Sequence, residues 1–278
     1  MIVDTHTHVI ARDETLYPLR PSGVGSQWFR DAPCTADELA ALTARAGVDA
    51  AVLVQAFGAY TYDNSYVVDA AAARPDRFVS VAIVDANDRR SPARLRELAR
   101  ESRFVGVRLF SIGASEHPQP TWLDDPATFP VWKVCAELGL QVVVACLPEH
   151  LPRLERVLQR FPDQPVVLDH CGFVELDDGP PYPKASELFR LARHANLHCK
   201  VTSNVLEGAA GPALIVDRLV TEFGADRLMW GSDFPQTHDR PYTELVALAR
   251  RACANLSERD RGLVLGGTAT QLWPELSQ

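Results

Sequence analysis

The sequence predicts a (β/α)8 TIM barrel, and three observations favour that fold class. Short runs rich in valine, isoleucine and leucine occur eight times in the 278 residues, each followed by an amphipathic stretch of helical period. Runs that are apolar on both faces are typical of parallel strands covered by helices. The longest loops follow the first, fourth and sixth runs (11–33, 111–126 and 173–183), and barrel enzymes build their sites from such loops.

Each strand and helix is predicted from its own stretch of sequence. The predicted strands are IVDTHTH (2–8), AAVLVQAF (50–57), FVSVAIVD (78–85), FVGVRLF (104–110), LQVVVACL (140–147), PVVLDHCG (165–172), LHCKVTSN (197–204) and RLMWGSDFP (227–235). Between them, residues 35–47 and 128–139 each begin at a threonine cap and end at a glycine, as helices do. No interior linker indicates a second domain, so we expect a single domain over residues 1–278.

Composition narrows the range of partners. The formal net charge is −8 and no run of like charge occurs, so no basic surface is predicted for nucleic acid. No apolar run is long enough to cross a bilayer, and the N-terminus lacks the pattern of a signal peptide. The six cysteines form no CxxC pair, which indicates reduced thiols. We expect a cytoplasmic protein that acts on a small molecule, without nucleic-acid or membrane partners; a homo-oligomer stays open.

Polar side chains occupy alternate positions in the first strand, which reads DTHTH over residues 4–8. Side chains alternate along a strand, so Asp4, His6 and His8 share one face, and in a closed barrel that face can be the lumen. Two imidazoles in a lumen can converge on one cation or one substrate group. The alternative is a pair of ordinary hydrogen-bonded core histidines.

Two more polar residues lie at the ends of predicted strands. The sixth strand ends in LDH, which contains His170, and the eighth ends in GSDFP, which contains Asp233. His170 could instead bond a loop carbonyl, and Asp233 could cap the following helix. Four buried Asp and His side chains at one barrel mouth are costly unless they are paired or bind a metal. We therefore predict that His6, His8, His170 and Asp233 converge as catalytic residues.

Arg108 is the main candidate for substrate binding. An arginine within the apolar run FVGVRLF needs a partner, and its planar fork suits a substrate carboxylate. The alternative is an ion pair with a barrel acid such as Asp85. Other candidates for substrate contact follow strands two, five and seven: Gln55, Tyr60, Cys146 and Asn204. Candidates for an aromatic lid lie in the long loops: Trp28, Phe29 and Trp122.

Four motifs together resemble one enzyme family. DTHTH, LDH, WGSDFP and the closing GGTATQLW resemble the amidohydrolase superfamily, nearest the amidohydrolase-related group that contains 2-pyrone-4,6-dicarboxylate lactonase and the sugar lactonases. The resemblance implies that His6 and His8 are metal ligands, or donors to a substrate carbonyl where metal is lacking. It implies that His170 is a metal ligand or a positioned acid/base. It also implies that Asp233, itself a further metal ligand, takes the proton from the attacking water.

The sequence departs from the metal-dependent members of that group. They usually carry a histidine at the end of strand five, where this chain has Cys146, or a lysine at the end of strand four, where it has VRLF. We therefore expect at most one weakly held divalent ion, zinc before others, with metal-free catalysis as the alternative. The pyrone lactonase places an arginine just after the strand-six histidine, whereas this chain has Phe173 and Val174. We expect a substrate with at most one anionic group.

The leading hypothesis is a hydrolase that opens a lactone or related cyclic ester by attack of water. A decarboxylase or hydratase acting on a small carboxylated substrate is the alternative within the same fold. A non-catalytic barrel that binds a small ligand is the alternative from another class.

Overall fold

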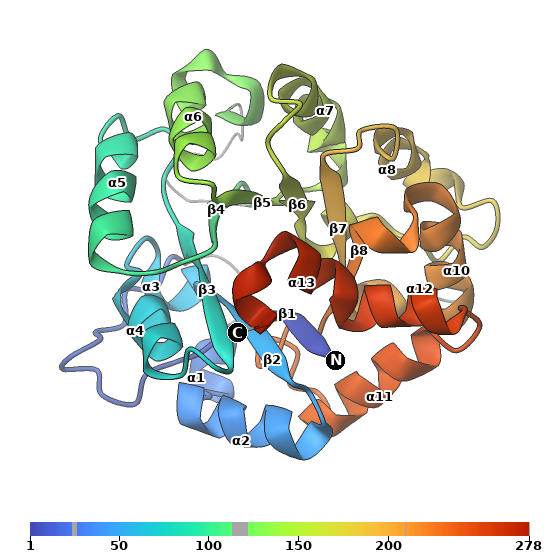
Figure 1. Cartoon of the computed structure of the whole chain (residues 1–278), viewed down its shortest axis with the longest axis horizontal. Coiled ribbons are helices and arrows are strands. Elements are labelled where there is room, and N and C mark those ends of the chain that lie inside the picture. Colours follow the sequence, from blue (N-terminus) through green and yellow to red (C-terminus); the bar gives the residue numbers. More distant parts are fainter. Residues whose placement is uncertain (24–26, 113–121, 209, 278) are drawn as a thin grey trace.

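Eight parallel strands lie side by side in chain order, as the sequence predicts (Figure 1). The structure, a computed structural model, describes residues 1–23, 27–112, 122–208 and 210–277. The strands are β1 (Val3–Thr7), β2 (Ala50–Val54), β3 (Phe78–Ile83), β4 (Gly106–Phe110), β5 (Gln141–Ala145), β6 (Val166–Leu168), β7 (Leu197–Thr202) and β8 (Leu228–Gly231).

The ends of β8 and β1 close the sheet into a barrel. The backbone N–H of Asp233 donates to the carbonyl of His6 at 2.9 Å, and that of His8 donates to the carbonyl of Phe234 at 2.8 Å. An isolated bridge pairs Thr7 with Phe234. The predicted (β/α)8 barrel is confirmed, and its closure places Asp233 beside the first-strand histidines.

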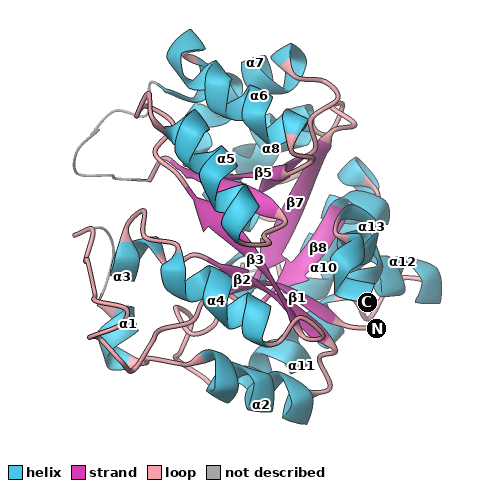
Figure 2. Cartoon of the chain, turned by 60° about the vertical axis from the view of Figure 1, so that its left-hand side comes forward, coloured by secondary structure: helices cyan, strands magenta, loops and turns pink. Residues whose placement is uncertain are grey.

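Helices surround the strands on the outside (Figure 2). Thr35 caps α2 by accepting a bond from the backbone N–H of Glu38, and Gly47 ends that helix with φ of 70°. The helices are α1 (Trp28–Asp31), α2 (Ala36–Ala46), α3 (Phe57–Tyr60), α4 (Ser65–Ala73), α5 (Ser91–Glu101), α6 (Phe129–Glu137), α7 (Leu151–Arg160), α8 (Ser186–Leu191), α9 (Ser203–Leu206), α10 (Pro212–Phe223), α11 (Tyr242–Ala252), α12 (Glu258–Gly262) and α13 (Thr268–Leu272). The two helices predicted between threonine and glycine are α2 and α6.

The N-terminal end of the barrel interior is apolar. Val3, Val143, Val167 and Met229, from four strands, pack in one buried cluster with Trp273, which follows α13. All five have no exposed surface. In this part of the molecule the barrel interior is a packed core, as in other barrels of this class.

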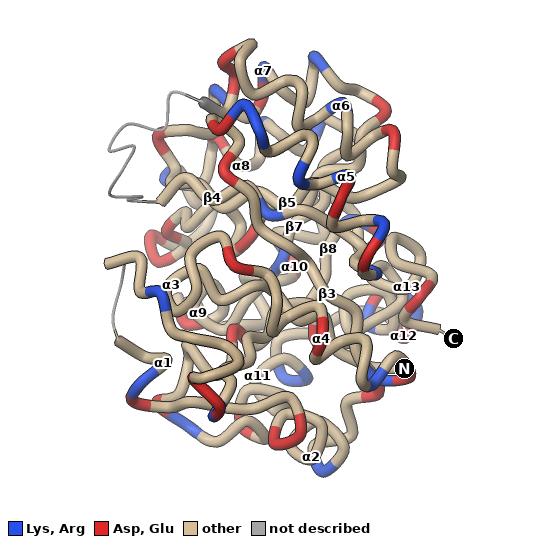
Figure 3. The backbone as a smooth tube through the Cα atoms, turned by 90° about the vertical axis from the view of Figure 1, so that its left-hand side faces the viewer, with Lys and Arg blue, Asp and Glu red and all other residues tan. Residues whose placement is uncertain are grey.

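Acidic and basic residues are interspersed along the backbone without forming a long stretch of one charge (Figure 3). Within the described residues, no helix combines the length and the apolarity that crossing a bilayer requires.

Candidate active site

The first strand carries His6 and His8 into the C-terminal mouth of the barrel, but not Asp4. The register between β1 and β2 shifts between Asp4 and Thr7, so strict alternation does not hold across that point. The carboxylate of Asp4 accepts bonds from the backbone N–H of Ser232 at 2.8 Å and from the hydroxyl of Tyr242 in α11 at 2.9 Å. Burial raises the pKa of Asp4 to about 6. Asp4 therefore links β1 to the outer helix layer instead of joining the two histidines.

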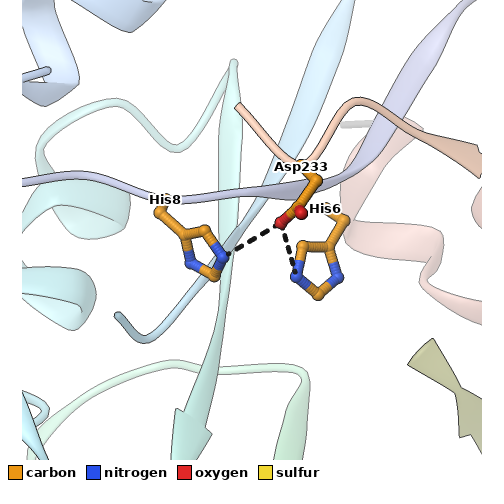
Figure 4. A group of neighbouring side chains, drawn as sticks. All are labelled: His6, His8 and Asp233. Atoms are coloured by element: carbon orange, nitrogen blue, oxygen red, sulfur yellow. Dashed lines mark ion pairs between the residues drawn. The ribbon is translucent and has the colours of Figure 1, made fainter. Parts of the chain in front are cut away.

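Asp233 lies between the two histidine rings (Figure 4). Its Oδ1 is 3.6 Å from His6 Nε2 and 3.5 Å from His8 Nε2. Its backbone φ is 61°, in the left-handed region that non-glycine residues rarely adopt. Residues with such strained backbones are found most often at functional sites. Burial opposes the negative charge, but His170, His8 and His6, when they are protonated, outweigh it and hold the pKa of Asp233 at about 2. The carboxylate is therefore ionised at any pH near neutrality.

His170 approaches the same place from a tight turn rather than from a strand. The predicted sixth strand ends early, at Leu168, and the residues that follow form a turn in which His170 has φ of 53°. Its ring centroid is 4.7 Å from that of His6. The structure thus brings His6, His8, His170 and Asp233 together at one mouth.

The hydrogen bonds behind His170 determine its tautomer. Asn204 Oδ1 accepts a bond from the backbone N–H of Val205 at 3.0 Å and one from the Thr202 hydroxyl at 2.5 Å. Because the Thr202 hydrogen is used in that bond, Thr202 Oγ1 accepts from His170 Nδ1 at 2.8 Å. The lone pair of the ring is then on Nε2. Burial lowers the pKa of His170, so the ring is neutral near pH 7.

A buried ionic group lies directly behind the histidines, centred on Asp169. Its Oδ1 is 3.2 Å from His6 Nδ1 and 3.1 Å from Lys200 Nζ, and its Oδ2 accepts a bond from Arg108 Nε at 2.8 Å. Burial alone would raise the pKa of this carboxylate, but Lys200, His6 and Arg108 hold it well below its usual range. Burial lowers the pKa of Lys200, and the neighbouring carboxylate opposes that shift.

Sequence reasoning missed Asp169 and Lys200 as parts of the site. Both are completely buried. Two signals were present: the acid in LDH directly before His170, and a lone lysine within the apolar seventh strand. A buried lysine needs a buried acid as its partner, but the sequence does not show which acid it meets.

Arg108 forms an ion pair with a barrel acid, which is Asp169. The guanidinium also lies 5.0 Å above the ring of Phe110 and lines the cavity at the mouth. Arg108 is therefore anchored through Nε and still faces the space where a substrate would lie.

The cavity beside these residues has a volume of about 260 Å³. Trp28 from the first long loop lines it, and the ring centroid of Trp28 lies 5.3 Å from that of His8 and 6.1 Å from that of Phe29, which packs edge-on. The side chain of Trp122 lies outside what the structure describes. The cavity lining consists of His8, Trp28, Phe57, Gly58, Arg108, Phe110, Ile112, Leu147, His170, Phe173 and Gln236.

Four predicted substrate contacts lie outside this lining. The side-chain amide of Gln55 donates to the carbonyls of Thr61 and Asp63, so it supports the loop after β2. The Tyr60 hydroxyl accepts a bond from the backbone N–H of Ala11.

The other two of these residues also have structural partners. Cys146 is buried in the apolar cluster between sheet and helices, where burial raises the pKa of its thiol to about 12. Asn204 is exposed and acts behind His170 through Thr202.

The fold and the site together define a class of protein. Imidazole and carboxylate side chains are buried together at the C-terminal mouth of a barrel, and that mouth is where barrel enzymes carry out catalysis. The family model described as amidohydrolase matches residues 3–274, and the chain is an enzyme of the amidohydrolase family.

Individual relatives agree with that family. The chain is 29% identical over 246 residues to L-fucono-1,5-lactonase of Burkholderia ambifaria, covering 85% of this chain and 83% of the relative. A solved structure from Pseudomonas putida, provisionally assigned as a 2-pyrone-4,6-dicarboxylic acid hydrolase, superimposes with a TM-score of 0.78 at 26% identity, covering 99% and 97% of the two chains. An amidohydrolase of Burkholderia multivorans with bound zinc has the same fold, with a TM-score of 0.77 at 22% identity and 99% of each chain covered.

Proposed function

We propose that this enzyme opens a lactone or a related cyclic ester by attack of water. The observation that carries the proposal is the convergence of His6, His8 and Asp233 on one point beside a cavity. The lactonase activity of the relative from Burkholderia ambifaria supports the choice of a cyclic ester.

The three converging groups suit a divalent cation. His8 Nδ1 lies 2.8 Å from the carbonyl of Val54, so it carries the ring hydrogen and Nε2 turns its lone pair toward Asp233. His6 Nε2 and Asp233 Oδ1 are buried, and neither has a hydrogen-bond partner among the described residues. Two imidazole nitrogens and a carboxylate oxygen, all within 4.8 Å of one another, match the donor set of catalytic zinc sites. A second group, His6, Asp169 and His170, meets the same distance limit.

Zinc held by His6, His8 and Asp233, with His170 adjacent, would supply Lewis acidity to the ester carbonyl. Lys200 Nζ lies 3.3 Å and Asp169 Oδ1 lies 3.2 Å from His6 Nδ1, so these two groups would hold the orientation of the His6 ring. Because strand five carries no histidine at its end, an ion bound here would have few protein ligands. We therefore expect at most one ion, held weakly.

Asp233 is the general base of the proposed reaction. It takes a proton from water as the water oxygen bonds to the carbonyl carbon. The carbon–oxygen bond of the ring then breaks, and the same proton passes to the alkoxide that leaves, so lactone and water give a hydroxy acid. Nε2 of neutral His170 accepts a hydrogen bond from the water and orients it, while Arg108 holds an anionic substituent of the ring.

A panel of cyclic esters tests the proposal. The purified protein is mixed with five- and six-membered lactones and with carboxylated aromatic acids, and acid release is followed with a pH indicator. Chelator is added, and zinc is then restored. Acid release from at least one lactone class that falls with chelator and returns with zinc is the expected result. Release of carbon dioxide from an aromatic acid, with no lactone opened, would replace the proposal with the decarboxylase alternative.

A further inference from the structure

The cavity at the mouth is mostly apolar, and this limits which cyclic esters it can hold. Trp28 and Phe57 are almost completely buried, and Phe110, Leu147 and Phe173 are half-buried. All five line the cavity of about 260 Å³. A small ring that enters this space therefore meets hydrocarbon over most of its surface.

The aromatic rings are arranged around the charged groups of the site. Phe57 and Phe110 stack with centroids 4.6 Å apart and an interplanar angle of 29°, and the guanidinium of Arg108 lies 5.0 Å from the Phe110 centroid. Phe173 lies 4.5 Å from the ring of His170. The guanidinium is thus held between a carboxylate at Nε and an aromatic wall, which orients it toward the cavity.

The side chains in the described lining that carry hydrogen-bonding groups are few: His8, Trp28, Arg108, His170 and Gln236. In the proposed reaction the two histidines serve the carbonyl and the attacking water. Arg108, Gln236 and the single indole N–H of Trp28 remain for the substituents of the ring. Each hydroxyl of a polyhydroxylated ring needs a hydrogen-bond partner when it is buried, and apolar walls offer none.

We infer that the substrate is a cyclic ester with a single carboxylate and few or no ring hydroxyls. The carboxylate pairs with Arg108 and the unsubstituted faces of the ring lie against Phe110, Trp28 and Phe173. This inference rests on the proposed function and sharpens it. It separates this chain from the L-fucono-1,5-lactonases that it resembles, because an aldonic lactone carries several hydroxyls and no carboxylate.

Binding tests the inference without relying on turnover. Tetrahydropyran-2-carboxylate and its trihydroxylated counterpart have no ester to cleave, and their affinities for the intact protein are measured by calorimetry. A hydroxyl placed in an apolar pocket is rejected by roughly 10²-fold. We therefore expect the unhydroxylated ring to bind about 10²-fold more tightly. Equal affinities, tighter binding of the trihydroxylated ring, or no binding of either would overturn the inference.

Matched lactones separate this inference from the proposed function. The six-membered lactone that carries one carboxylate should be opened with a kcat/KM about 10²-fold above that of its trihydroxylated counterpart. If neither lactone is opened while the binding preference persists, the proposed hydrolysis fails and the preference for an apolar anionic ring stands. If both are opened with equal kcat/KM, the preference fails and the hydrolysis stands.

Phe110→Asn adds a hydrogen-bonding group to the wall of the cavity. It should reduce the binding preference from about 10²-fold to within about 10-fold, because the amide satisfies a ring hydroxyl. Phe189→Asn is the matched control: Phe189 is half-buried in α8, stacks on Arg218 and does not line the cavity. An unchanged preference in a folded Phe110→Asn protein would count against the aromatic wall as the source of specificity.

Discussion

The two ends of the barrel interior are built from opposite kinds of side chain. The N-terminal end packs valines and Met229 against Trp273. The C-terminal end buries two carboxylates, an ammonium, a guanidinium and three imidazoles within a few ångströms of one another, namely Asp169, Asp233, Lys200, Arg108, His6, His8 and His170. Lys200 lies between the two ends of the barrel interior, because its Nζ pairs with Asp169 at the C-terminal end and is 6.0 Å from the Trp273 ring at the N-terminal end.

The contrast separates stability from chemistry. Each apolar side chain buried at the N-terminal end stabilises the fold by roughly 1.5–3 kcal/mol. Charges buried at the C-terminal end lose hydration, and pairing recovers that loss only in part. Such a cluster is weak support for stability. It is better explained by the function that we propose for it, and changes at the two ends should have different effects.

The largest effect should follow from Asp233→Asn. An amide cannot take a proton from water, so we expect kcat to fall by about 10²- to 10⁴-fold while the fold is retained. The measurement is kcat on the best lactone, with circular dichroism to follow folding. Asp163→Asn, at an exposed acid, is the matched control. A folded Asp233→Asn enzyme that keeps most of its turnover would remove Asp233 from the mechanism.

Met229→Ala should act at the opposite end and in the opposite way. Met229 has no exposed surface, so its truncation leaves a cavity and should lower the free energy of unfolding by about 2–5 kcal/mol. Turnover of the protein that remains folded should be unchanged. Urea denaturation and kcat at low temperature measure the two quantities. A large fall in kcat without loss of stability would show that the two ends are coupled.

Asp169→Asn tests the ionic group behind the histidines. Asp169 Oδ1 lies 3.2 Å from His6 Nδ1 and its carboxylate pairs with Lys200 and Arg108, and changes to such supporting groups typically lower metal affinity by about 10- to 100-fold. Zinc affinity is measured by competition with a chelator of known affinity, on the variant and on Asp163→Asn. Equal zinc affinities in the two folded variants would make Asp169 a purely structural ion-pair partner.

The sequence predicts the barrel and the approach of the histidines because strand periodicity and motif order are local properties. His6, His8 and Asp233 lie at or beside strand ends, and the ends of parallel strands meet at one mouth. Features that depend on contacts between residues far apart in the sequence, or on the local path of the backbone, could not be predicted from these patterns. The register shift in β1 turns the Asp4 carboxylate toward the Tyr242 hydroxyl. The tight turn after Leu168 places the Asp169 carboxylate beside Nδ1 of His6.

The partners of buried charges are non-local in the same sense. Arg108 and Lys200 come from β4 and β7, and both meet Asp169 after β6. Nothing in the spacing of the three residues indicates that contact, so the sequence suggested an ion pair of Arg108 with a barrel acid, Asp85 being the example, but did not identify Asp169 as that acid. Cys146 was predicted at the mouth because it ends a strand, but its side chain points into the outer apolar cluster.

Arg108→Met should weaken substrate binding selectively. A charge-assisted hydrogen bond contributes about 1.5–3 kcal/mol, so KM should rise roughly 10- to 100-fold for carboxylated lactones and little for neutral ones. The measurement is KM and kcat on a matched pair that differs only in the carboxylate. Equal losses for the two substrates would mean that Arg108 serves mainly as the ion-pair partner of Asp169.

The smallest effect should follow from Cys146→Ala. The thiol lies in the apolar cluster outside the strands and its raised pKa, about 12, keeps it protonated, so it offers no thiolate to zinc or substrate. We expect kcat/KM and zinc affinity to stay within about 2-fold of the parent, since no contact of the site is lost. The free energy of unfolding should fall by roughly 1 kcal/mol because one buried heavy atom is removed.

Cys135→Ala is the matched control for Cys146→Ala, because Cys135 is another completely buried thiol in the same cluster, and its effects should be the same. A loss of zinc affinity confined to Cys146→Ala would instead extend the charged end of the barrel to β5.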